Sequence, residues 1–208
     1  MKRSARRSRR AGYTIIEVMM AIGVLTAGAV GIMALIQAST RGNMEARQMS
    51  TGTMLASRWV ERLRRDALQW TRSTTVADPT LFNQTRFFNG NVPAAGTAPT
   101  WFVPALDPIT GETPNFDYYG QDTTDPVQMR YCTNVRLEWL YLGNAVRADV
   151  RVWWLRNESG IGAADATRSV LAQCAPGVAP DALTNDFRVR MAYASTIIRY
   201  TPMPAPGP

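Results

Sequence analysis

The sequence predicts an α+β protein in which one long N-terminal helix is followed by an antiparallel sheet. An uncharged, apolar run of 19 residues at 18–36 continues without a proline into an amphipathic segment. Further along the chain, two segments of alternating apolar and polar residues flank a Gly-Asn pair. The 208 residues leave room for one domain of ordinary size beside a membrane segment.

A single helix is expected from about Thr14 to Trp70. Its first part is apolar on every face, and roughly 20 such residues suffice to cross a bilayer. Its second part has one apolar face with spacings of four and three, made by Met49, Thr53, Ala56, Val60, Leu63, Ala67 and Trp70. The remaining polar residues are expected on the surface: Arg58, Glu61, Arg62, Arg65, Asp66 and Gln69.

Strands are expected at residues 128–142 and 145–155, with Gly143 and Asn144 forming the hairpin turn. Alternation places four residues of the first strand on one face: Val135, Leu137, Trp139 and Tyr141. Residues 187–200 are expected to supply a third strand, with room for a fourth. Residues 72–126 contain seven prolines and several aromatics, which predicts an ordered but irregular region with short strands.

Charge and composition exclude several classes of function. The net charge is +7, but six basic residues precede the apolar run, and the remainder has 17 basic against 16 acidic residues. No nucleic-acid partner is therefore expected.

The absence of histidine excludes Ser-His-Asp catalysis and histidine-ligated metals. Asp122 and Asp125 could form a calcium loop, but a turn or helix-cap role is commoner. We expect no enzyme activity, no catalytic residue, no metal and no cofactor.

The basic N-terminus places the start of the chain in the cytoplasm and the rest beyond the membrane. A plain single-pass anchor and a secretory signal cut within residues 27–29 both fit the apolar run. Glu17 argues against both readings, because a carboxylate inside an apolar segment costs a few kcal/mol and needs a partner.

The segment around Glu17 reads R-R-A-G-Y-T-I-I-E-V. It resembles the class III leader of type IV pilins and pseudopilins. The resemblance implies that Gly12 is the last leader residue and that a prepilin peptidase cuts after it. Tyr13 then becomes the first mature residue, with a methylated amine, and Glu17 becomes the fifth. The fold it implies is the type IV pilin fold, in which a long helix packs on an antiparallel sheet.

The segment from Gly12 to Arg65 is most similar to PilV-type minor pilins, with their Ile-Glu-Val start and a later Glu-Arg-Leu-Arg. This resemblance implies a minor pilin that joins a complex priming pilus assembly, at the tip or near it, and supports twitching motility and adhesion. The implied partners are other minor pilins, the major pilin, the prepilin peptidase, the inner-membrane assembly platform and a PilY-type tip adhesin. A minor pseudopilin of type II secretion, and a tip subunit that binds surfaces or DNA, remain alternatives.

These observations divide the chain into six segments. They are a basic leader at 1–12, a membrane or filament-core helix at 13–40, an amphipathic half-helix at 41–71, a connecting region at 72–126, a sheet region at 127–200 and a proline-rich tail at 201–208. Before assembly the chain is expected to cross the inner membrane once, with its C-terminal domain in the periplasm. Because that compartment is oxidising, Cys132 and Cys174 are expected to form a disulfide. Two separate buried thiols are the alternative.

Overall fold

The structure is a computed structural model that describes residues 12–70, 79–94, 96–156, 174 and 189–200. The expected leader and proline-rich tail therefore lie outside the described residues, apart from Gly12. The elements in order are α1 (Ile15–Trp70), α2 (Pro79–Phe82), β1 (Asn115–Phe116), β2 (Tyr131–Tyr141), β3 (Ala145–Leu155) and β4 (Val189–Arg199). The chain forms two compact units, residues 1–47 and 48–208, and α1 contributes to both.

The described part of the first unit is helical from Ile15 onward, one residue later than expected. The preceding Thr14 caps the helix, since its side-chain oxygen accepts the backbone N–H of Glu17 at 3.4 Å. Every side chain from 12 to 47 is exposed. Gly23, Gly28 and Gly31 do not interrupt the helix. By length and composition, α1 could cross a membrane.

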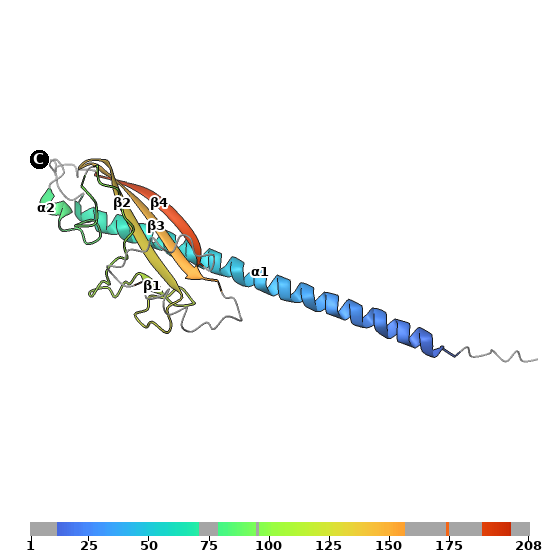
Figure 1. Cartoon of the computed structure of the whole chain (residues 1–208). Coiled ribbons are helices and arrows are strands. Elements are labelled where there is room, and N and C mark those ends of the chain that lie inside the picture. Colours follow the sequence, from blue (N-terminus) through green and yellow to red (C-terminus); the bar gives the residue numbers. More distant parts are fainter. Residues whose placement is uncertain (1–11, 71–78, 95, 157–173, 175–188, 201–208) are drawn as a thin grey trace, which may run out of the picture. The chain divides into compact units, whose positions relative to one another are not determined.

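The second unit contains an antiparallel sheet with strand order β1-β2-β3-β4 (Figure 1). β2 and β3 form the expected hairpin. Gly143 lies in the turn with a φ of 76°, a conformation that glycine adopts without strain. The turn is closed by the N–H of Asn144, which donates to the carbonyl of Tyr141 at 2.9 Å.

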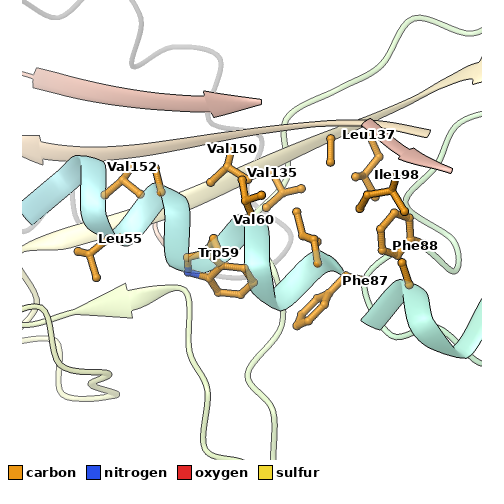
Figure 2. Close-up of a cluster of buried hydrophobic side chains, with 14 of the residues drawn as sticks. Leu55, Trp59, Val60, Phe87, Phe88, Val135, Leu137, Val150, Val152 and Ile198 are labelled. Atoms are coloured by element: carbon orange, nitrogen blue, oxygen red, sulfur yellow. The ribbon is translucent and has the colours of Figure 1, made fainter. Parts of the chain in front are cut away.

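The core lies between residues 48–70 of α1 and one face of the sheet. Leu55, Trp59 and Val60 of the helix meet Val135, Leu137, Val150, Val152 and Ile198 of the strands (Figure 2). The expected apolar face of the helix is confirmed for Ala56, Val60, Leu63, Ala67 and Trp70, which are all buried. Met49 and Thr53 are exposed instead. The buried face is wider than the spacing indicated because Leu55 and Trp59 belong to it.

Three details of the sheet differ from expectation. β2 begins at Tyr131, because residues 126–128 form a turn. Residues 189–199 form one strand, and no fourth long strand occurs among the described residues. The expectation that Tyr141 shares the face of Val135, Leu137 and Trp139 is wrong. An irregularity between Trp139 and Tyr141 shifts the register, so Tyr141 pairs with Ala145 and is 68% exposed.

The connecting region lies along the β2 edge of the sheet. β1 pairs with the start of β2, and Phe102 forms an isolated bridge with Val135. Phe87, Phe88 and Phe116 are buried in the core. Most of the aromatics in this region therefore cover the sheet and the helix, whereas Tyr118 and Tyr119 are exposed.

Gly52 allows the sheet to approach α1 closely. A Cβ at this position would lie 2.5 Å from Cζ3 of the buried Trp154 ring. We predict that Gly52→Ala lowers the free energy of unfolding by about 1–3 kcal/mol, because the ring must shift in a packed core. Thermal unfolding of the full-length protein in detergent, followed by near-UV circular dichroism, measures this, since all six tryptophans lie beyond residue 48.

Gly42→Ala is the matched control, because nothing lies within 4 Å of a Cβ added there. Alanine favours a helix over glycine by about 1 kcal/mol, so this variant should unfold no earlier than the original protein. Equal unfolding temperatures for the two variants would contradict the close approach of Trp154.

Candidate functional site

The junction between the expected leader and the mature chain lies just before α1. Gly12, Tyr13 and Thr14 have irregular backbone, and Tyr13 is 82% exposed. A peptidase binds its substrate in an extended form, so a cleavage site between Gly12 and Tyr13 suits this stretch better than one inside the helix. The secretory-signal alternative would require cleavage at residues 27–29, which lie within α1.

Glu17 is the third residue of α1 and the acidic residue of its first turn. Its N–H also donates to the carbonyl of Thr14 at 3.1 Å. Thr14 and Glu17 have the Thr-x-x-Glu spacing of a capping box, which the sequence analysis missed although the spacing was visible there. A negative charge at this end of a helix is favoured by the helix dipole, typically by 0.3–1 kcal/mol.

The Glu17 carboxylate has no ion-pair partner in the part of the chain that the structure describes. The sequence explains this, because Glu17 is the only charged residue between Arg10 and Arg41. The side chains around it are exposed and apolar, including Ile16 and Met20. In lipid or in an apolar assembly, a cation from outside this helix would have to neutralise Glu17.

A second polar cluster, centred on Arg62, holds the connecting region to the helix. The Arg62 side chain is only 1% exposed. One guanidinium nitrogen donates to both carboxylate oxygens of Asp122 at 2.8 and 2.9 Å, and another donates to the carbonyl of Thr113 at 3.1 Å. The guanidinium also stacks over the rings of Trp59 and Phe116.

The expectation that Arg62 lies on the surface is wrong. Arg58 and Arg65 lie on the same side of the helix as Arg62. Arg58 binds Asp122 and Arg65 binds Glu112, at 2.7 Å each, and Arg62 contacts both carboxylates. The spacing of four and three from Arg58 to Arg65 was a usable signal, since it repeats the spacing of the apolar face.

Asp66 is also half-buried, and its carboxylate accepts the backbone N–H groups of residues 86 and 87.

Asp125 has the turn role that we considered commoner than a calcium loop, because it accepts the N–H of Val127 at 2.8 Å. Asp122 has a different role, since it forms ion pairs with Arg58 and Arg62. No group of three or more potential ligand side chains that could hold a metal ion occurs among the described residues.

The disulfide between Cys132 and Cys174 is present, with the two Cα atoms 5.9 Å apart. It joins the start of β2 to a residue 42 positions later in the chain. A small apolar cluster surrounds it, made by Met129, Trp153 and Val189. The prediction of a disulfide is thus confirmed, and the alternative of two separate thiols is wrong.

The face of the sheet away from α1 carries several arginines, and one carboxylate, Asp149, pairs with two of them. Asp149 pairs with Arg136 and Arg147 and accepts a hydrogen bond from Ser195. Burial alone would raise the pKa of Asp149, but hydrogen bonds from Ser195, Arg136 and Arg147 outweigh it and lower that pKa. Trp101 stacks over Arg136 and Arg151. The named arginines of this face are therefore held by a carboxylate and by an aromatic ring.

Comparison of the chain with protein-family models, curated proteins and solved structures finds no match.

We predict that Arg62→Leu lowers the free energy of unfolding by about 3–5 kcal/mol, because it removes the buried guanidinium that binds both carboxylate oxygens of the partly buried Asp122. Arg64→Leu is the matched control. Arg64 pairs with Glu61, and both side chains are more than half exposed, so its loss should cost about 1 kcal/mol or less. Denaturant titration with tryptophan fluorescence measures both values. Similar losses for the two variants would show that the Arg62 cluster stabilises the fold no more than an exposed ion pair does.

The disulfide generates a further prediction. Replacing both Cys132 and Cys174 by alanine should lower the free energy of unfolding by about 3–4 kcal/mol, because the cross-link restricts the unfolded chain. The oxidised and the chemically reduced protein should differ by a similar amount in the same titration. A difference below about 1 kcal/mol would contradict this role.

Proposed function

We propose that the chain is a minor pilin of a type IV pilus, cleaved after Gly12 and anchored by the first part of α1 until it is assembled. Its role is to join other minor pilins in a complex that primes pilus assembly, at the tip or near it. The proposed partners are those minor pilins, the major pilin, the prepilin peptidase, the inner-membrane assembly platform and a PilY-type adhesin.

The observation that carries the proposal is Glu17. It is a lone carboxylate in the first turn of an exposed apolar helix, four residues after Tyr13. An ordinary membrane anchor has no use for such a charge, which costs a few kcal/mol in lipid. A helix that leaves lipid to pack against other helices can use the charge to select a position in which a cation faces it.

Cleavage between Gly12 and Tyr13 would create that cation. The new N-terminal amine of Tyr13 is protonated at neutral pH and stays so after one methylation. In the proposed assembly, the amine of one subunit lies beside the Glu17 carboxylate of its neighbour. Paired charges cost much less in an apolar environment than separate ones, so the pair favours one axial register between subunits.

The second unit is compatible with this role. It presents an amphipathic continuation of the same helix, covered by an antiparallel sheet, and it contains a disulfide. A disulfide suits a domain in the periplasm or outside the cell. The proposed location is therefore the inner membrane, with a periplasmic domain, followed by the extracellular pilus.

The capping role of Glu17 must be separated from its role in pairing. Glutamine serves in a capping box as well as glutamate does, so Glu17→Gln keeps the helix start and removes only the charge. Thr14→Val is the converse variant, since it removes the side-chain cap and keeps the charge.

We predict that Glu17→Gln is cleaved, inserted and folded but does not assemble. The expected loss is about 3–5 kcal/mol of pairing free energy, because the neighbouring ammonium is left without its carboxylate. Co-purification with the other minor pilins, and piliation of a strain that lacks the original gene, are the measurements. Thr14→Val should assemble normally, because its charge remains.

Normal piliation by Glu17→Gln would refute the pairing role. Failure of Thr14→Val, with normal assembly of Glu17→Gln, would indicate that helix capping, and not charge, decides incorporation. If the original protein, returned to the strain that lacks its gene, restores protein secretion and not pili, the subunit belongs to a type II secretion system.

A further inference from the structure

The outer face of the sheet has an apolar hollow at its hairpin end. Its volume is about 380 Å³, and its lining includes Leu140, Tyr141, Ala145, Ile197 and Arg199. The strand register explains the hollow. Ala145 pairs with Tyr141 on one side and with Arg199 on the other, so a methyl group lies between two large side chains.

The apolar side chains around this hollow are unusually exposed for a folded sheet. Leu140 is 49% exposed, Tyr141 68% and Ile197 53%. The neighbouring turn adds Leu142, at 64%. Contiguous apolar surface of this kind commonly marks a contact with another segment or molecule, because covering it releases water from apolar groups.

The chain itself arrives at this hollow. Tyr200 follows β4 directly and belongs to the hollow's lining. Its N–H donates to the carbonyl of Asn144 at 2.8 Å, which continues the pairing with the hairpin one residue beyond the strand. The next residues, 201–208, therefore begin at the rim of the hollow. They lie outside the described residues.

The sequence of that segment suits an apolar surface with an aromatic wall. It reads T-P-M-P-A-P-G-P, with a proline at every second position and no charge. Such sequences favour the polyproline II conformation, which rises about 3.1 Å per residue. Crossing from β4 over β3 to β2 takes two strand spacings of about 4.8 Å each, a distance that three or four residues in this conformation can span.

We infer that residues 201–208 bind in cis across the hollow, with their prolines and Met203 against Tyr141, Leu140 and Ile197. Polyproline II segments commonly bind to aromatic-lined grooves, because their stiff backbone loses little entropy on binding. Direct attachment at Tyr200 raises the effective concentration of the segment at the hollow to about the millimolar range. The segment thereby covers the apolar end of the sheet. This inference is independent of the proposed function.

Photo-crosslinking of the full-length protein in detergent tests this inference. p-Benzoyl-phenylalanine replaces Met203, and mass spectrometry locates the cross-links after irradiation. We expect cross-links within one chain, concentrated at residues 140–145 and 197–199. Ala145→Leu fills the hollow and should reduce their yield several-fold. Ala98→Leu, an exposed alanine that does not line the hollow, is the matched control and should leave the yield unchanged.

Tyr141→Ala provides a second variant that does not depend on fitting a larger side chain into the sheet. Its side chain is mostly exposed, so its removal should leave the fold intact and still reduce the cross-links. Near-UV circular dichroism checks the fold of each variant. Cross-links scattered over the domain, cross-links between chains, or yields unchanged by both variants in the hollow would overturn the inference.

Discussion

The packing of α1 residues 48–70 against one face of the sheet is the interaction on which the rest of the second unit depends. The helix supplies Leu55, Trp59 and Leu63, which are fully buried. The sheet supplies a row of valines, and the connecting region closes the core with its phenylalanines (Figure 2). Gly52 belongs to the same arrangement, because a larger residue would hold the helix away from Trp154.

The same helix meets a different requirement before residue 48. There its side chains are apolar and exposed, and its only charge between Arg10 and Arg41 is Glu17. Such a surface is unstable in water and suits lipid or other helices. One continuous helix thus combines an apolar segment with a segment that organises a folded domain, and the two parts differ in their need for partners. This division is the physical basis of the proposed role in a pilus.

The sequence predicted the features that depend on local patterns. The bounds of α1 and the β2–β3 hairpin follow from periodicity and from Gly143. The disulfide followed from having two cysteines and an oxidising compartment. The spacing of Arg58, Arg62 and Arg65 indicated a shared side of the helix, but it could not indicate what buries Arg62, because its carboxylate partner Asp122 lies 60 residues away in an irregular region.

The same distinction between local and long-range features applies to the candidate site and to the hollow. Gly12, Tyr13 and Glu17 could be proposed from the sequence because their spacing is local, and their roles stay predictions. The cap from Thr14 was visible in that spacing too. The register shifts at Tyr141, and a hollow results. Both depend on how three strands align, so the sequence of no single strand predicts them. Pairing across strands is set by the whole sheet, so a single segment does not encode it.

The N-terminal residue of the protein isolated from its own membranes tests the account most directly. Intact-mass and peptide mass spectrometry should find a chain that begins at Tyr13 and carries one methyl group on its amine. Gly12→Val should abolish that species, because the peptidase requires a residue without a side chain there. A chain that keeps its basic leader, or that begins within residues 26–30, would contradict the account.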